Sequence, residues 1–393
     1  MTLNFPRRRN SPSGPSAVVL GFWNGLGYLW DDIAVGIAHA LAPMDVDVVG
    51  IDLADVEPHE FSKTRLDSSG LDFRKACRQL IRLRSRYSQN PVLFSTGEKP
   101  TAMLAEHADT LSKHFNFHWT VSKKLFRIID KSRTPDLCRK TGIAYPLTHV
   151  TSPQEDVGVA AKKFVFPCIV KPNLINQSWN IRGGFPGRHL IANSSQELLE
   201  FYDKFPTLRG STIWQQLIDG DDSSIFQCSA LISRSGKVAG SVCVRKLRQT
   251  PMGHGSMSYG RTEWNSEVVS RTIKLAESLE LTGYVSAEFK YQKTTNEYYF
   301  IELNPRLPAY NAFFPDTGVN LARLGYLDLV GQALPDRCFQ RDLIHWMTFR
   351  NISPTEPMRT LKEGTHIAKS WRTFLECQIK PHALRTIHTL VRR

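Results

Sequence analysis

Hydrophobic positions in the first part of the chain alternate between short apolar runs and helical spacing. Ala17–Leu20 and Val46–Leu53 are rich in β-branched and aliphatic residues, which predicts buried strands. Between them, the apolar positions of Ile33–Leu41 recur at helical spacing. Strands that alternate with helices predict a doubly wound α/β layer, which we place at residues 16–119 after a disordered segment, residues 1–15.

The glycines after the first predicted strand separate this layer from the best-known nucleotide-binding motifs. Gly21, Gly25 and Gly27 follow the order G-x-x-x-G-x-G. A dinucleotide site is expected to have G-x-G-x-x-G, and a P-loop has G-x-x-x-x-G-K-[ST], a pattern that this sequence lacks. An NAD-dependent oxidoreductase and a P-loop NTPase are therefore both disfavoured.

The pattern changes near residue 120. Leu125–Lys140 has helical spacing and is followed by Gly142, a residue that suits a helix C-cap. Phe164–Pro172 then predicts a strand, and a long polar loop with several glycines covers Asn173–Arg188. Further strands follow, and Glu267–Leu281 is an amphipathic helix.

Two strands of alternating polarity, joined by a short loop, carry the most informative acids. If Gln292 pairs with Tyr298, the register of this hairpin places Glu288 directly opposite Glu302. The same alternation predicts that Glu302 shares its strand face with Phe300 and Asn304. The hairpin therefore brings together two carboxylates that are well separated in the sequence.

Facing carboxylates destabilise a sheet unless a cation lies between them. Mg²⁺ takes hard oxygen ligands, few of them from protein and the rest from water and phosphates. Glu288, Glu302 and the amide oxygen of Asn304 are therefore the candidate metal ligands, with Mn²⁺ as the alternative ion. The structural alternative is a hairpin whose acids are paired by Lys290 and Arg306.

The order Glu288, then Glu302-x-Asn304-x-Arg306, resembles the metal-binding signature of ATP-grasp enzymes. The resemblance covers roughly residues 120–334. It implies that Lys131 and Lys171 bind nucleotide phosphates, that Gln215, Gln216 and Ile218 form the hinge that holds adenine, and that Asp222 lies near the ribose. Gln215 stands where the family usually has a glutamate. The fork of Arg306 suits a developing acyl phosphate, and Lys246 is expected to contact the γ-phosphate or that intermediate.

The implied fold is α/β, with an N-terminal pre-ATP-grasp Rossmann-like layer followed by a two-lobed ATP-grasp domain. The first lobe contains Lys171 and the hinge at 211–222, the second lobe covers 223–334, and a basic tail covers 335–393. Arg245–Lys246 before a glycine-punctuated loop resembles the predicted carboxylate-amine ligase (carboligase) branch. In that loop, His254 is either a general base or an ordinary loop histidine.

The resemblance implies ATP and Mg²⁺ as cofactors. The activity that it implies joins a carboxylate to an amine through an acyl phosphate and releases ADP and phosphate. Small-molecule acid and amine substrates are expected. An ATP-grasp kinase or phosphotransferase is one alternative, and a nucleotide-binding protein without turnover is another.

Composition adds a location and a set of partners. The 393 residues carry a net charge of +13, and the seven cysteines are scattered, which favours reduced thiols in a cytoplasmic protein without a signal peptide. The basic charge suits an anionic substrate, and no specific nucleic-acid partner is expected. In the tail, aromatic and aliphatic residues interleave with basic ones, which predicts a peripheral contact with an anionic inner membrane surface. A homodimer is left open.

Overall fold

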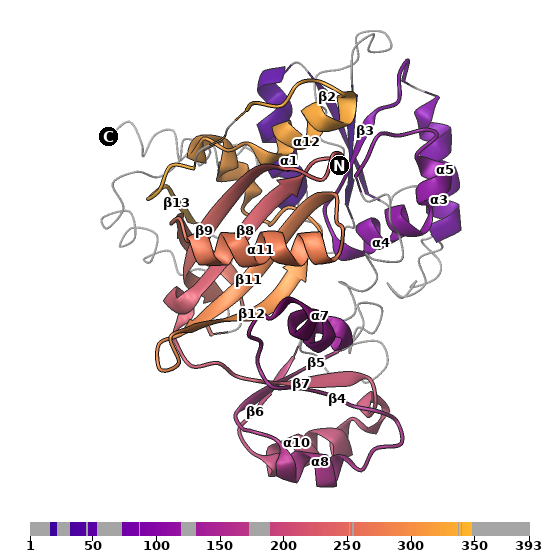
Figure 1. Cartoon of the computed structure of the whole chain (residues 1–393). Helices are drawn as coiled ribbons and strands as arrows, with labels where there is room; N and C mark the ends of the chain where they lie inside the picture. The colour runs from indigo at the N-terminus through magenta and orange to yellow at the C-terminus, as the bar shows by residue number, and fades with distance from the viewer. Residues whose placement is uncertain are drawn as a thin grey trace, which may run out of the picture.

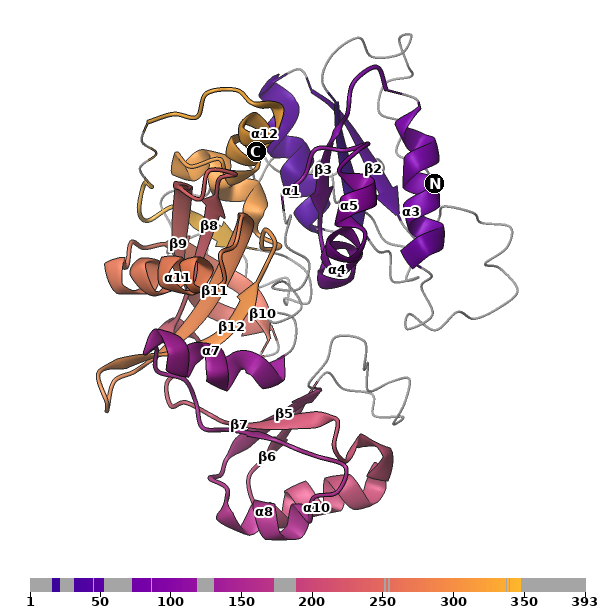
Figure 2. The ribbon, with the colours of Figure 1, turned by 45° about the vertical axis from the view of Figure 1, so that its right-hand side comes forward.

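The structure, a computed structural model, is a mixed α/β fold of three parts (Figures 1 and 2). It describes residues 16–21, 32–44, 46–52, 73–85, 87–118, 131–172, 189–250, 252–253, 255–336, 338 and 340–347. The predicted disordered start, the glycine-rich loop at 173–188, His254 and the basic tail after Met347 lie outside the described residues. None of the described helices is long and apolar enough to cross a membrane.

The N-terminal part contains a parallel sheet of three strands in the order β2-β1-β3. Its elements are β1 (Ser16–Gly21), α1 (Asp32–Leu41), β2 (Asp47–Asp52), α3 (Phe73–Arg84), β3 (Val92–Ser95), α4 (Glu98–Glu106) and α5 (Ala108–Leu111). The strands β1 and β2 and the helix α1 lie where the apolar pattern predicts them. Buried residues such as Val18, Ile37 and Phe94 form the core between the sheet and its helices.

The small lobe is an antiparallel sheet in the order β4-β7-β5-β6, with two helices on one face (Figure 2). Its elements are β4 (Thr148–Val150), α8 (Val157–Lys163), β5 (Cys168–Pro172), β6 (Leu190–Ala192), α10 (Ser195–Lys204) and β7 (Thr212–Gln216). The lobe has a separate hydrophobic core around Trp214, Tyr202 and Leu198. The helix α10 begins after its N-cap, Ser194, whose hydroxyl accepts a hydrogen bond from the Glu197 backbone N–H at 3.2 Å.

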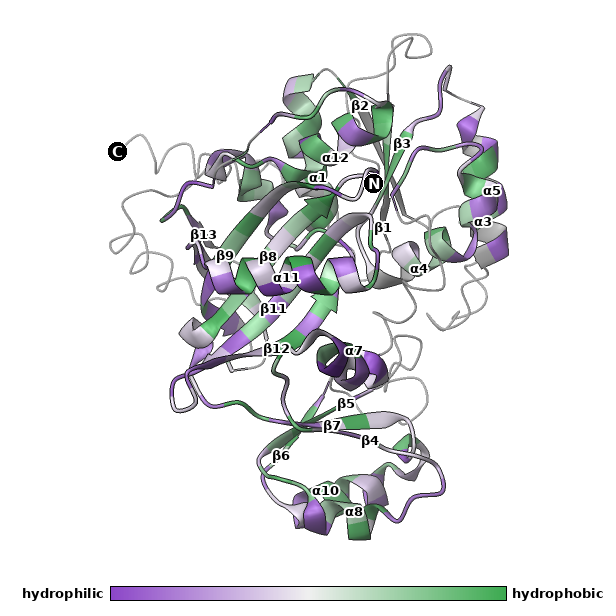
Figure 3. Cartoon of the chain, viewed as in Figure 1, coloured by the Kyte–Doolittle hydropathy of each residue, from purple (hydrophilic) through white to green (hydrophobic). Residues whose placement is uncertain are grey.

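The large lobe is an antiparallel sheet in the order β12-β11-β8-β9-β10-β13. Its main elements are β8 (Ile225–Ile232), β9 (Val238–Thr250), β10 (Ser256–Thr262), α11 (Ser266–Ser278), β11 (Gly283–Gln292), β12 (Glu297–Asn304), α12 (Leu321–Val330) and β13 (His345–Met347). The helix α11 lies across one face of the sheet (Figure 1). It carries hydrophobic and hydrophilic residues along its length, as expected of a helix with one face on a sheet (Figure 3).

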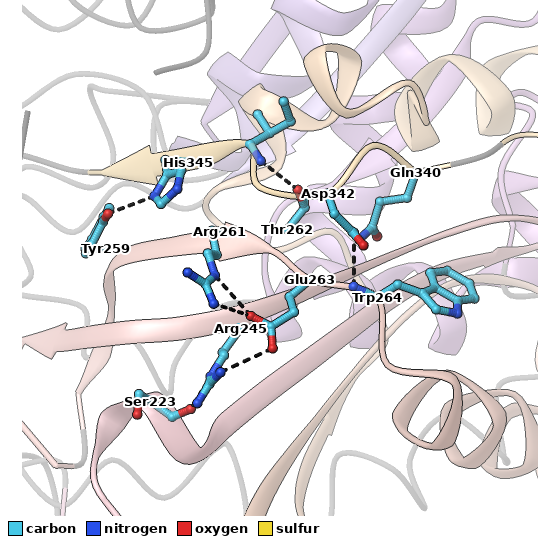
Figure 4. A network of polar contacts seen from close by, with 11 residues as sticks. Ser223, Arg245, Tyr259, Arg261, Thr262, Glu263, Trp264, Gln340, Asp342 and His345 are labelled. Carbon is cyan, nitrogen blue, oxygen red and sulfur yellow. Dashed lines mark hydrogen bonds and ion pairs between the residues drawn. The ribbon is translucent and has the colours of Figure 1, made fainter. Parts of the chain in front are cut away.

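The large sheet continues beyond residue 334, where the second lobe was expected to end. The strand β13 pairs with β10, and a set of polar contacts fixes it there (Figure 4). The Ile344 backbone N–H donates to the Thr262 hydroxyl at 3.0 Å, and Tyr259 and His345 are hydrogen bonded at 2.7 Å. Residues 340–347 therefore belong to the large lobe.

The helix α7 (Thr134–Thr141) directly precedes the small lobe in the sequence and lies at the junction of the two lobes (Figure 2). The helix ends at Gly142, which has a φ of 63° and supplies the left-handed C-cap that the sequence predicts. Just beyond it, the Ala144 carbonyl accepts a hydrogen bond from the Phe300 N–H of β12 at 2.8 Å. This bond ties the crossing segment to the hairpin that carries the candidate metal ligands.

Candidate active site between the two lobes

A pocket lies between the small-lobe sheet and the strand β12. It is lined by Lys131, Thr134, Lys171, Ile213, Gln215, Ile301, Glu302, Leu303, Asn304 and Pro305. Both lobes and the short segment before α7 therefore contribute to its walls. Five of the residues that the sequence singles out, Lys131, Lys171, Gln215, Glu302 and Asn304, are brought together here.

Strand alternation explains the small-lobe wall of the pocket. Along β5, Val170 points into the lobe's core, and its neighbour Lys171 points to the pocket. Along β7, Trp214 is in the core and Gln215 lines the pocket. The Lys171 ammonium donates a hydrogen bond to the Gln215 amide oxygen at 3.2 Å. A neutral glutamine at this place accepts this bond without adding a third acid to the site.

The hairpin of β11 and β12 pairs Glu288 with Glu302, as the sequence predicts, but the register near the turn differs from the predicted one. Gln292 pairs with Glu297 and not with Tyr298, because the connecting loop is only residues 293–296 and Asn296 adopts a left-handed φ of 52°. This tighter turn shifts the pairing by one residue. The shift is cancelled at Ile301, an extra residue on β12 that forms a β-bulge between Phe300 and Glu302.

Because of the bulge, Glu302 lies on the other strand face from the one that regular alternation predicts. Glu302 and Phe300 do not share a face: Phe300 packs against Phe289 in the core with ring centroids 5.6 Å apart, whereas Glu302 lines the pocket. Asn304 does share the side of Glu302, because its amide Nδ2 donates to Glu302 Oε1 at 3.0 Å. The amide oxygen of Asn304 is therefore the atom that remains to act as a ligand.

Nearby cations keep Glu302 ionised. Burial by itself raises the pKa of a carboxylate, but Lys131, Lys171 and the hydrogen bond from Asn304 outweigh it and lower the pKa of Glu302 to about 2. The same surroundings act on Lys171. Burial of its ammonium group and the nearby Lys131 lower the pKa of Lys171 to about 8, although Glu302 and Glu288 oppose the shift.

Glu288 is buried and forms an ion pair with a third lysine. The Lys246 ammonium lies 2.6 Å from Glu288 Oε2, and both side chains are nearly inaccessible to solvent. Burial raises the pKa of Glu288, and Lys246 opposes that rise. The alternative in which Lys290 and Arg306 pair with the two acids is wrong for the described residues, because the observed partner of Glu288 is on β9. Removing one member of such a buried pair typically costs about 3–5 kcal/mol.

Asp222 lies at the end of this polar group, near the start of β8. Its carboxylate accepts hydrogen bonds from the Gln249 backbone N–H at 2.7 Å, from the Gln249 side-chain amide at 2.8 Å and from the Gly253 N–H at 2.9 Å. Both of its oxygens are thus bound to protein donors, and the carboxylate fixes the connection between β9 and β10. Its contact with a ribose stays a prediction.

The remaining predicted residues surround this site. Gln216 and Ile218 lie at the crossing between the lobes, where the Gln216 N–H donates to the Leu147 carbonyl at 2.9 Å and Ile218 is buried. Arg306 follows β12, and its Nη1 donates to the Leu307 carbonyl at 3.2 Å. Its Nε is buried and has no hydrogen-bond partner among the described residues. A buried donor without a partner is the feature expected of a side chain that binds a ligand.

Sequence reasoning missed two glutamines. Gln249 connects Asp222 to Lys246, and Gln227 pairs with Glu288 across β8 and β11. The signal for Gln227 is strand alternation, because Gln227 and Ser229 are polar residues on one face of an otherwise buried strand. Gln249 gives no such signal. Residues three apart on a regular strand point to opposite faces, but Leu247 is an extra residue of β9 in its pairing with β10. This irregularity places Lys246 and Gln249 on the same face.

Comparisons with known proteins agree with this geometry. Residues 181–309 match the model of a family described as "ATP-grasp domain". A D-aspartate ligase of Enterococcus faecium is 24% identical over 262 residues, which are 62% of this chain and 61% of that protein. The chain thus spans about three fifths of the length of this relative.

Solved structures show the same fold at low identity. The N5-carboxyaminoimidazole synthetase from Staphylococcus aureus, complexed with ADP, has a TM-score of 0.59 at 13% identity and covers 84% of this chain and 82% of its own. The L-amino acid ligase from Bacillus licheniformis has a TM-score of 0.57 at 13% identity and covers 85% and 79%. Residues 181–309 thus match an ATP-grasp domain, and the chain resembles ligases in sequence and in fold.

Proposed function

We propose that this protein is an ATP-dependent ligase that joins a small-molecule carboxylate to an amine through an acyl phosphate and releases ADP and phosphate. The observation that carries the proposal is the pocket between the lobes. In it, two lysines, a strongly acidic glutamate and an asparagine amide converge, and a second glutamate lies directly opposite the first. Such a set of groups suits phosphoryl transfer, which is catalysed by positioning and by neutralising phosphate charge.

The residues present fit a divalent cation. Glu302 is ionised at all physiological pH values, and Glu288 lies opposite it. The Asn304 NH₂ group donates to Glu302, which leaves the Asn304 amide oxygen as a possible metal ligand. The described part of the chain holds no group of three or more His, Cys, Asp or Glu side chains that could bind a metal, so water and phosphate would have to supply the other ligands of a Mg²⁺ ion here. When bound, Mg²⁺ or Mn²⁺ would neutralise charge on the phosphate oxygens.

Different residues of the site would bind the phosphates, the adenine and the acyl phosphate. Lys131 and Lys171 would bind and orient the phosphates, and the segment from Gln215 to Ile218 would hold the adenine between the lobes. Arg306, whose Nε has no partner among the described residues, would stabilise the charge of the acyl phosphate with Lys246. We also propose that the N-terminal parallel sheet is a pre-ATP-grasp Rossmann-like layer that helps to bind the substrates.

The names of two similar proteins suggest the class of substrate. A D-aspartate ligase and an L-amino acid ligase are among the matches, so amino acids are the first acids and amines to test. The direct experiment measures ADP release, with Mg²⁺, from the purified chain against a panel of carboxylates and amines. The proposal predicts ADP formation that requires both an acid and an amine, and its loss in Lys171→Met.

Other outcomes of the panel would point elsewhere. ADP formation with an acid alone, together with a stable phosphorylated product, would make the protein a kinase or phosphotransferase. Tight ADP binding without turnover on any pair would favour a nucleotide-binding protein, and AMP with pyrophosphate would contradict the acyl-phosphate route.

A further inference from the structure

Four buried polar side chains form a continuous row from the start of β8 to the hairpin. Asp222 holds the side-chain amide of Gln249 at 2.8 Å, the Gln249 amide oxygen lies 3.4 Å from the Lys246 ammonium, and Lys246 pairs with Glu288 at 2.6 Å. All four residues are less than 9% exposed. The row starts next to the hinge between the lobes and ends at a candidate metal ligand.

The row has a fixed polarity. The Gln249 side chain directs its NH₂ group to an Asp222 carboxylate oxygen and its own amide oxygen to the Lys246 ammonium, which can only donate. The Asp222 carboxylate also accepts the Gln249 backbone N–H at 2.7 Å, so the glutamine is held at two points. Lys246 therefore has two acceptors, the Glu288 carboxylate and an amide oxygen that cannot turn away.

Lys246 forms an ion pair with Glu288 Oε2, an oxygen of the carboxylate that is proposed to bind the metal. An ammonium 2.6 Å from Glu288 and a divalent cation bound to the same carboxylate repel each other, since both lie in a region shielded from water. Binding of the cation therefore favours a movement of Lys246 away from Glu288. The Gln249 oxygen, 3.4 Å from the ammonium, is its other acceptor among the described residues.

We propose that Lys246 is the resident counter-ion of Glu288, that a divalent cation displaces it toward Gln249, and that Asp222 and Gln249 are positioning residues for this exchange. The proposal rests on the proposed function, because it takes Glu288 as a metal ligand. It adds that the metal-free site is kept charge-balanced by a lysine, which is freed for the phosphates only when metal is bound.

The test measures Mn²⁺ binding by electron paramagnetic resonance, without nucleotide or substrates, so that activity is not the readout. Lys246→Met removes the competing cation and is expected to bind Mn²⁺ about tenfold more tightly than the wild type. Gln249→Leu removes the alternative acceptor, holds Lys246 on Glu288 and is expected to weaken Mn²⁺ binding about threefold or more. Lys237→Met, at an exposed lysine in the turn before β9, is the control and should match the wild type.

The double variant separates positioning from general damage. If Gln249 acts only through Lys246, Lys246→Met with Gln249→Leu should bind Mn²⁺ as Lys246→Met does. If Gln249→Leu weakens Mn²⁺ binding in the Lys246→Met background as much as it does in the wild type, the glutamine does not act through Lys246, and its positioning role is overturned. Should Lys246→Met fold poorly, Lys246→Gln serves instead, and added Mn²⁺ should raise its melting temperature more than that of the wild type.

The outcomes distinguish this inference from the proposed function. If the wild type binds Mn²⁺ and Lys246→Met binds it equally or more weakly, the displacement is wrong while the metal site stands. If the wild type binds no Mn²⁺, even with ADP, the metal site, the proposed function and the exchange all fail together.

Discussion

Glu288 and Glu302 lie directly opposite each other on β11 and β12, and a single extra residue, Ile301, allows this pairing. A regular ladder from the turn, with Gln292 against Glu297, would place Ile301 opposite Glu288 and turn Glu302 to the core face. The bulge therefore places a carboxylate in the pocket while Phe300 stays in the core. Bulges that re-aim a side chain in this way are common next to active sites.

Neutralising either acid should remove metal-dependent function, and Glu288→Gln should also lower the free energy of unfolding because it leaves Lys246 buried without its ion-pair partner. For Glu288→Gln and Glu302→Gln we expect turnover to fall by on the order of 100-fold or more, because each removes a group that positions charge at the phosphates. ADP affinity should fall in Mg²⁺ but not in EDTA, as measured by calorimetry. Glu297→Gln, on the same strand but paired with Arg271, is the control. Wild-type turnover in either site variant would show that the metal site lies elsewhere.

Nucleotide affinity should depend on pH through Lys171. Burial lowers the pKa of Lys171 to about 8, whereas a lysine in an unfolded chain has a pKa of about 10.4. The ammonium that binds phosphate is therefore lost as pH rises through about 8, and ADP affinity measured in EDTA should fall up to about tenfold per pH unit above it. Lys171→Met should be weaker and flat across this range. Lys204→Met, on α10 of the same lobe, should keep the wild-type profile.

The same pKa makes a prediction about stability with the opposite sign. Between about pH 8 and about pH 10.4 the folded protein binds fewer protons at Lys171 than the unfolded chain. The contribution of this residue to the free energy of unfolding therefore rises with pH across that window. Urea titrations of the wild type and Lys171→Met should diverge there in this direction. Parallel curves would show that Lys171 titrates alike in both states.

Gly325 tests how closely α12 packs on the large sheet. A Cβ atom at this position would lie 1.9 Å from the Tyr284 hydroxyl oxygen, and Tyr284 is buried. Gly325→Ala should therefore lower the free energy of unfolding by about 1–3 kcal/mol, despite alanine's higher helix propensity. Tyr284→Phe in the same background should restore part of the loss, because it removes the clashing oxygen. A neutral or stabilising Gly325→Ala would mean that the helix packs less closely than described.

Arg306 should be required for the chemical step and less for nucleotide binding. Its buried Nε lacks a partner among the described residues, which is expected of a group that meets a ligand. Arg306→Met should reduce kcat by on the order of 100-fold with a small change in ADP affinity. Arg306→Lys should not restore it, because an ammonium cannot reproduce the planar fork. An unchanged kcat in Arg306→Met would remove it from the catalytic groups.

The sequence predicted those features that depend on local pattern. The strands at Ala17 and Val46 and the C-cap at Gly142 follow from apolar spacing and cap chemistry, and the structure confirms them. The facing of Glu288 and Glu302 was also predicted, but with a loop one residue too long and without a bulge. These two errors cancelled.

Features that depend on irregular backbone or long-range contacts could not be predicted. Ile301 and Leu247 are ordinary strand residues, so nothing in their chemistry marks them as the extra residues of a bulge. The partner of Glu288 is Lys246 on a different strand, a pairing that depends on the order of strands in the large sheet. The short β13 lacks the length that would distinguish it from a loop.

The transfer of oxygen from the acid to phosphate distinguishes an acyl phosphate from an acyl adenylate. With the acid and amine found by the ADP-release panel, the carboxylate is labelled with ¹⁸O and the inorganic phosphate is analysed by ³¹P NMR. We expect one ¹⁸O atom in each phosphate released, with ADP as the nucleotide product, because the carboxylate attacks the γ-phosphate directly. Unlabelled phosphate, or label recovered in AMP alongside pyrophosphate, would contradict the acyl-phosphate mechanism.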